Sequence, residues 1–183
     1  AIRKSDQKKV GSIIIPVFID DVTGENTDEL LHQSRFSPIW SVLSALRAHD
    51  EVLREQIDQL RFEWGRHGRM IGTLPAKVSI DMPTEVGMDF VQAINIRIVE
   101  TTTASWEFWI GLLTAYTERE GHSRVHVFHK ERGYPLGRWV IRQRNQREWL
   151  SPEQVSILDG FAGWVWSVSE AAWEEGFAIL KKF

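Results

Sequence analysis

Tryptophan is the feature of this 183-residue chain that most restricts how it can fold. The chain has nine tryptophans, and seven of them stand at Trp106 or later. An eleven-residue pattern from Trp106 to Tyr116 recurs 67 residues further on, from Trp173 to Phe183, with tryptophan, glutamate, leucine and a final aromatic residue in register. Recurrence at a fixed spacing is typical of repeated helical modules. We therefore expect one repeat and the start of a second.

Composition excludes several classes of protein. The chain has no cysteine, so it can form no disulfide, thiolate nucleophile or cysteine zinc site. Its formal net charge of −3 is too small for a polyanion-binding or a solvating acidic chain as a whole. No apolar run approaches the roughly 18 residues that a membrane span needs, and the polar, basic first residues do not follow the signal-peptide pattern. We expect a cytoplasmic protein with no membrane partner.

A short apolar run at Val10–Ile19, rich in β-branched residues, predicts a buried strand that ends near Pro16. A strand that is apolar on both faces belongs in a parallel sheet, and one strand cannot form a sheet alone. The chain also begins at Ala1, and its second repeat stops after one helix. These three features predict a fragment of a longer protein.

Helical periodicity dominates the rest of the chain, so the predicted fold class is mainly α. Apolar residues recur at three- and four-residue steps in each of the predicted helices. Good start signals precede two of them: Ser37 as a cap before Pro38, and the capping box at Ser151–Gln154. The predicted helices are Pro38–Trp64, Glu85–Val99, Thr102–Gly121, Leu136–Gln146 and one that begins at Ser151, with short strands at Lys77–Ile80 and Val125–Phe128.

Charge is unevenly distributed along the chain. Residues 1–101 carry a net −3, whereas residues 119–148 carry +5 and three histidines. A basic stretch beside aromatic residues is the usual electrostatic signature of nucleic-acid contact. A solvated helix face has the same composition, so charge alone leaves both interpretations open.

The predicted helix at 136–146 concentrates this charge. Arg138 and Arg142 stand one turn apart on one face, and Leu136, Trp139, Val140 and Gln143 form the predicted buried side. The planar guanidinium group can donate two hydrogen bonds to one phosphate, and an exposed indole can stack on a base. Core packing is the expected role of Trp106, Trp109 and Trp139, and Trp164 and Trp166 are expected to close the bundle. The candidate nucleic-acid-binding residues are Lys130, Arg132, Arg138, Arg142, Arg144, Arg147 and Trp149.

Motifs for catalysis and metal binding are missing. No Gly-x-x-x-x-Gly-Lys-Ser/Thr loop occurs, so the chain is not expected to bind or hydrolyse ATP by itself. Asp20 and Asp21 could imitate a magnesium pair, but the surrounding motif is absent. His122, His126 and His129 have ligand-like spacing, yet Gly121 interrupts the helix that would aim them at one ion. We predict no metal site and no catalytic residue in this chain.

These residues resemble a known family. The pattern is similar to the helicase-associated domain, a small helical module found in tandem after the motor of certain bacterial superfamily 2 DNA/RNA helicases. The similarity covers about residues 103–166, and a second copy starts near Ala172. It is carried by Trp106, Leu113, Tyr116, Gly121, Val125, Gly133, Leu136-Gly137, Trp139-Val140, Gln143-Arg144, Leu150-Ser151 and Leu158.

The front of the chain resembles the end of the second RecA-like motor lobe of such helicases. Lys9–Phe18, Phe36, Trp40–Leu43 and Ala45–Arg47 carry this similarity. It implies that Arg3 is the stub of an arginine-finger motif. The implied organisation is a lobe remnant at 1–70, a connector with a helix at 71–101, a helicase-associated repeat at 102–166 and a truncated second repeat at 167–183.

The resemblance implies a function: a nucleic-acid-binding accessory region of an ATP-dependent helicase that grips the phosphate backbone. The implied partners are nucleic acid, with DNA favoured over RNA, and the upstream motor lobes; ATP and magnesium would belong to the parent protein. The alternatives are a protein-interaction module that docks on the motor or a partner, and a parent enzyme of another kind, such as a nuclease with a motor.

The second repeat lacks its partner helices in this sequence. We therefore predict that Trp173–Phe183 is loosely held. Hydrogen exchange at these amides should be fast, and strong protection would contradict the prediction.

Overall fold

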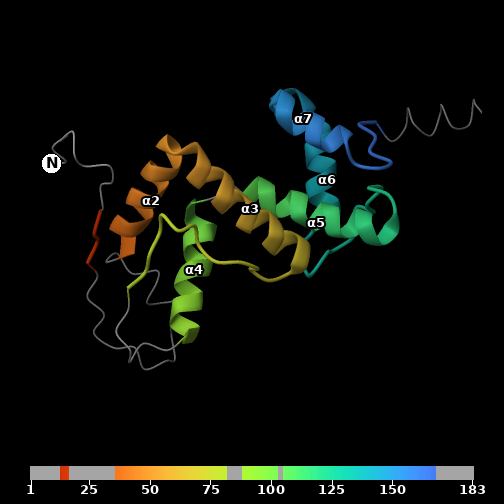
Figure 1. The fold of residues 1–183 in the computed structure, drawn as a ribbon. Helices are drawn as coiled ribbons and strands as arrows, with labels where there is room; N and C mark the ends of the chain where they lie inside the picture. Colours follow the sequence, from red (N-terminus) through yellow and green to blue (C-terminus); the bar gives the residue numbers. More distant parts are fainter. Residues whose placement is uncertain (1–12, 17–35, 82–87, 103–104, 168–183) are drawn as a thin grey trace, which may run out of the picture. The chain divides into compact units, whose positions relative to one another are not determined.

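The computed structural model describes residues 13–16, 36–81, 88–102 and 105–167, and this part of the chain is helical (Figure 1). The chain divides into two compact units: unit 1 is Ala1–Arg54 with Leu74–Thr102, and unit 2 is Glu55–Thr73 with Thr103–Phe183. The mainly α fold class is confirmed. The described helices are α2 (Ser37–His49), α3 (Glu51–His67), α4 (Met88–Thr102), α5 (Ser105–Glu120), α6 (Leu136–Asn145) and α7 (Pro152–Asp159), with one 3₁₀ turn, η2 (Arg147–Trp149).

Asp50 separates α2 from α3, where the sequence pattern predicts one continuous helix. Its backbone is extended, with φ −123° and ψ 102°, and its N–H still donates to the carbonyl of Leu46. Its carboxylate accepts the N–H of Leu53 at 3.0 Å, so it satisfies a free amide in the first turn of α3. Hydrogen bonds from Lys77 and from the Leu53 amide hold the pKa of this carboxyl below its usual value. The break cannot be predicted from the local sequence, because an aspartate on the outer side of a continuous helix and an aspartate that caps a new helix give the same residue pattern.

The core of unit 1 forms where α2 packs against α4. The predicted helix at Glu85–Val99 is observed as α4, which runs on to Thr102. Ser37 is the first residue of α2 rather than its cap, because Phe36 occupies the cap position without a side-chain hydrogen bond. The buried side chains of this core are Phe36, Leu43, Phe90, Ile94 and Ile98.

The three predicted strands are corrected where the structure describes them. Residues 13–16 are irregular, and the rest of Val10–Ile19 lies outside the described residues, as do Arg3, the Asp20-Asp21 pair and Trp173–Phe183. Lys77–Ile80 forms no strand: the N–H of Val78 closes a turn on the carbonyl of Pro75. Val125–Phe128 likewise passes into a turn. In both segments, no neighbouring strand is present in the described part of the chain to accept ladder hydrogen bonds.

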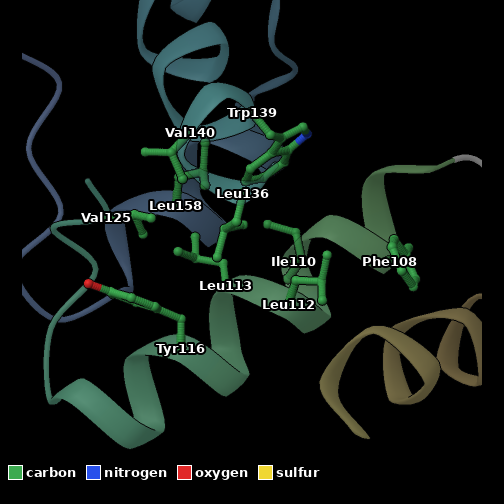
Figure 2. Close-up of a cluster of buried hydrophobic side chains, with 10 residues drawn as sticks. All are labelled: Phe108, Ile110, Leu112, Leu113, Tyr116, Val125, Leu136, Trp139, Val140 and Leu158. Carbon is green, nitrogen blue, oxygen red and sulfur yellow. The ribbon is translucent and has the colours of Figure 1, made fainter. Parts of the chain in front are cut away.

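The core of unit 2 gathers side chains from α5, α6, α7 and the loop between α5 and α6. Figure 2 shows Leu113, Leu136, Val140 and Leu158 converging above α5, whereas Phe108 lies on the other side, towards α3. Leu112, Leu113, Leu136, Val140 and Leu158 are completely buried.

Three tryptophans join α6 to α5. The Trp139 ring is stacked on Trp109, with ring centroids 5.8 Å apart and planes 7° apart, and it lies 5.4 Å from Trp106. Trp139 is buried and the other two are half-buried. The predicted core role of these three residues is confirmed. Trp164 and Trp166 also pack against this core.

The second half of α3 crosses α5 at two glycines. A Cβ on Gly65 would lie 2.1 Å from the Phe108 carbonyl oxygen, and a Cβ on Gly111 would lie 2.1 Å from that of Phe62. Only glycine permits this approach of the two backbones. The Arg61 guanidinium lies over both rings of the seam, 4.7 Å from the centroids of Trp64 and Phe108. Residues 55–73 are therefore packed as part of unit 2.

An ion pair completes this seam. Arg66 donates two hydrogen bonds to the carboxylate of Glu118, at 2.6 and 3.3 Å. The seam thus has small residues at its centre and charged residues at its edge.

The start signal of the last helix is confirmed. Ser151 accepts the amide of Gln154 at 3.2 Å, and the Gln154 side chain accepts the amide of Ser151 at 3.0 Å. This reciprocal capping box begins α7 as the sequence predicts. No helix in the described residues is both long and apolar enough to cross a membrane.

Replacing Gly111 should destabilise the chain. Alanine usually stabilises a helix interior relative to glycine by about 0.5–1 kcal/mol. Here the new methyl group would overlap the Phe62 carbonyl, so we expect Gly111→Ala to lower the free energy of unfolding by about 1–3 kcal/mol. Urea denaturation followed by tryptophan fluorescence measures this change.

Gly160→Ala is the matched control. A Cβ at Gly160 meets no atom closer than 3.3 Å, and its φ is −71°. This variant should unfold almost as the native chain does. Equal stability of both variants would contradict the close crossing of α3 and α5.

Candidate nucleic-acid interface

A buried carboxylate fixes the loop that leads from α5 into α6. Both oxygens of Glu131 accept hydrogen bonds from Arg119, in the last turn of α5, at 2.9 Å each. His129 Nε2 lies 3.0 Å from the second oxygen. The Arg119 guanidinium holds the pKa of the Glu131 carboxyl below its usual value, and the carboxylate in turn raises the pKa of Arg119. The loop is therefore tied to α5 by a charge-assisted, bidentate pair.

A tight turn follows at Glu131–Tyr134, where the two residues exchange backbone hydrogen bonds at 2.9 Å. Both central residues have positive φ, 50° at Arg132 and 85° at Gly133. The Arg132 guanidinium donates to the carbonyl of Arg66 at the end of α3, at 2.9 Å. The Arg132 guanidinium was expected to bind phosphate, but it forms a hydrogen bond within the chain instead.

The first turn of α6 is pressed against this loop. A Cβ on Gly137 would lie 2.0 Å from the His126 carbonyl oxygen, and the Gly137 amide donates to His129 at 3.1 Å. The predicted buried side of α6 is confirmed, since Leu136, Trp139, Val140 and Gln143 are all buried. Because these residues face the core, the opposite side of α6 faces away from it.

Arg138 and Arg142 lie on that opposite, exposed side. Among the described residues neither guanidinium has an ion pair, a hydrogen bond or a ring contact, and the same holds for the exposed Lys130 in the preceding loop. An arginine without an internal partner can donate all of its N–H groups to an external anion. These three exposed residues of α6 and its preceding loop are therefore available to an anionic ligand.

Arg144 and Arg147 are placed differently. The Arg144 guanidinium lies 5.0 Å from the ring centroid of Trp164, and that of Arg147 lies 4.8 Å from Trp166. Burial lowers the pKa of Arg144, and its Nε and Nη2 atoms are shielded from water without a hydrogen-bond partner in the described part of the chain. The indole N–H of Trp166 donates to Asp159 at 2.7 Å. These two arginines hold the segment after α7 against α6 and η2 through cation–π contacts.

Trp149 ends the 3₁₀ turn η2, and 87% of its surface is exposed. Its neighbour Leu150 packs against the core of unit 2, and the capping box of α7 follows at once. The indole is therefore exposed on a segment that is fixed on both sides.

The histidines of this loop make contacts within the loop and with α5. His129 reaches Glu131, and its ring lies edge-on to Tyr116 at 4.9 Å. His122 and His126 accept backbone amides two residues further on through Nδ1. In the described ranges, no three histidine or acidic side chains are placed to share one metal ion.

Two residues of this region differ from the sequence-based expectation. The pattern predicts Phe128 in a strand, but it lies in a turn and 74% of its surface is exposed. Glu131 was counted only as a negative charge, although it is 5% exposed and anchors the loop. The alternation of residues 125–128 imitates a strand, and no local pattern distinguishes a buried glutamate from a surface one. The role of Glu131 becomes apparent only from its bidentate pair with Arg119, twelve residues earlier.

The described part of unit 2 is thus a small helical module with an exposed basic helix face and an exposed tryptophan. Residues 103–167 match the family model of the helicase associated domain, which supports the resemblance of this part of the chain to that module. No curated protein and no solved structure matches the chain.

Glu131 should make the stability of the chain depend on acidic pH. Because its pKa is lowered in the folded state, its stabilising effect is complete above the usual glutamate pKa and is lost as the pH falls through the folded value. Glu131→Gln should lower the free energy of unfolding by about 1–3 kcal/mol at neutral pH.

Urea titrations from pH 7 to about pH 3 test this prediction. The difference between the native chain and Glu131→Gln should shrink as the pH falls below the usual glutamate pKa, because the unfolded chain then takes up a proton that the Arg119–Glu131 pair disfavours in the folded chain. A difference that stays constant with pH would show that the ion pair is not its source.

Proposed function

We propose that this chain is the nucleic-acid-binding accessory region of an ATP-dependent helicase of the bacterial superfamily 2 class. The match of residues 103–167 to the helicase associated domain supports the link to a helicase. The observation that carries the binding proposal is the outer face of α6, where Arg138 and Arg142 are exposed and without internal partners among the described residues.

The proposed contact is with the phosphate backbone. Arg138 and Arg142 stand one helical turn apart, about 6 Å along the axis, so they can reach phosphates of one strand. Lys130 adds a third cation just before the helix. Contacts of this kind give affinity and orientation, and they do not read a base sequence. The ligand is a nucleic acid, with DNA favoured over RNA.

The remaining parts of the proposed machine lie outside this sequence. The chain contains no Gly-x-x-x-x-Gly-Lys-Ser/Thr loop, so upstream RecA-like motor lobes would hold ATP and magnesium and would supply the hydrolysis. ATP hydrolysis in the motor lobes would drive movement along the strand, while α6 would stay bound to the phosphate backbone. We place this activity in the cytoplasm.

Salt dependence tests the phosphate contacts. Fluorescence anisotropy should show the full chain binding labelled DNA and RNA at low ionic strength, with the logarithm of affinity falling linearly with that of salt concentration. Each phosphate contact contributes about 0.7–0.9 to the slope. Arg138→Gln/Arg142→Gln should therefore reduce the slope by about 1.5 and weaken binding to all sequences alike.

Arg54→Gln/Lys77→Gln is the matched control. It removes the same charge from unit 1, where these residues pair with Glu51 and Asp50. It should leave the slope almost unchanged. Absence of binding at low salt, or equal effects of both double variants, would contradict the proposal and would favour a protein-interaction module instead.

A further inference from the structure

We infer that the ligand of this surface is a single strand, whose bases stack on Trp149 and Phe128 at the two ends of α6. This inference rests on the proposed function, because it assumes that α6 contacts phosphates. It adds the form of the nucleic acid and two further binding residues.

Trp149 differs from every other tryptophan in the described residues. Trp40, Trp64, Trp106, Trp109, Trp139, Trp164 and Trp166 are all at least half-buried, whereas Trp149 is 87% exposed. Its indole makes no ring contact and no hydrogen bond within the described part of the chain. A free face of this size is what a base needs for stacking.

The backbone around Trp149 is well fixed. Its amide donates to the carbonyl of Gln146 at 2.9 Å, and the amide of Leu150 donates to Arg147 at 3.2 Å. Leu150 packs against the core, and Arg147 is held over Trp166 at 4.8 Å. A platform on a fixed turn loses little conformational entropy when a ligand binds.

Phe128 lies at the other end of α6. It is 74% exposed, and it sits in the turn whose carbonyls at 126 and 127 contact Gly137. Its amide donates to His126 Nδ1 at 3.4 Å, and its ring lies 5.7 Å from the His126 ring. The turn that contains Phe128 packs against the first turn of α6, and η2, which contains Trp149, follows the last turn of α6.

Arg138 and Arg142 lie on the helix between these two aromatic residues. The ten residues of α6 span about 15 Å, which corresponds to about four nucleotides at the 3.4 Å rise of a stacked strand. With Lys130 before the helix, three cations without internal partners among the described residues therefore stand between the two aromatic residues along the chain. Phosphate contacts between two stacking platforms are the combination used by proteins that bind single strands.

The strand form follows from the accessibility of base faces. In a duplex both faces of each base are covered by neighbouring base pairs, and exposing one costs a few kcal/mol. A single strand presents these faces freely. An exposed aromatic residue can also dock a protein, but such sites are contiguous apolar patches. Between Phe128 and Trp149 the sequence instead places Arg138 and Arg142, which have no internal partner in the described part of the chain.

Three labelled probes test this inference on the full chain: a thymidine strand of about 12 nucleotides, a hairpin duplex of similar length, and an abasic strand with the same phosphates. The native chain should bind the thymidine strand about tenfold more tightly than the duplex. A matching uridine strand distinguishes RNA from DNA.

Variants at the platforms separate stacking from charge. Trp149→Leu and Phe128→Leu keep an apolar side chain and remove the ring, so each should weaken binding of the thymidine strand about fivefold or more. Trp149→Phe keeps a ring and should retain most of the affinity. On the abasic strand, Trp149→Leu and the native chain should bind equally.

The outcomes distinguish the two proposals. Equal or tighter binding of the duplex, or leucine variants that bind the thymidine strand as well as the native chain, would overturn the single-strand inference while leaving the phosphate contacts intact. No binding of any probe at low salt would contradict the proposed function itself. Unfolding curves should show that each variant is folded, since Trp149 and Phe128 are mostly exposed and contribute little to the core.

Discussion

The packing of Trp139 against Trp106 and Trp109 is the contact on which unit 2 depends. It joins α6 to α5 through three large rings, and it fixes the rotation of α6 about its own axis. Once that rotation is fixed, Gln143 must turn inwards and Arg138 must face water. The same interaction thus builds the core and sets the position of the exposed cations.

Polar contacts then determine where the connecting segments lie. The Arg119–Glu131 pair holds the loop before α6, and the cation–π contacts of Arg144 and Arg147 hold the segment after α7. Of the basic residues between 119 and 148, several are therefore used within the fold. The charge that remains for a ligand is smaller than the sequence indicates, and it is concentrated on α6 and Lys130.

Periodicity predicted the helices, the mainly α class and the buried side of α6, because apolar spacing reports directly on which side faces a core. The capping box at Ser151 was also predictable from the sequence, since all its groups lie within four residues. Glu131 and the partners of Arg132 and Arg144 were not, because each depends on a residue that only the folded chain brings near. The cap at Asp50 is local, but the same residue would fit an uninterrupted helix. Trp149 was a candidate for base stacking and is exposed, whereas the exposure of Phe128 was not expected because residues 125–128 alternate as in a strand.

The two glycines at the crossing of α3 and α5 have a consequence for where a module begins. The family match starts at residue 103, yet the backbone of α5 rests on a helix that ends at His67. A polypeptide trimmed to the matched residues would leave Phe108 and the bare backbone at Gly111 facing water. Sequence families record which residues recur together, whereas a folding unit also includes whatever neighbour covers its apolar surface.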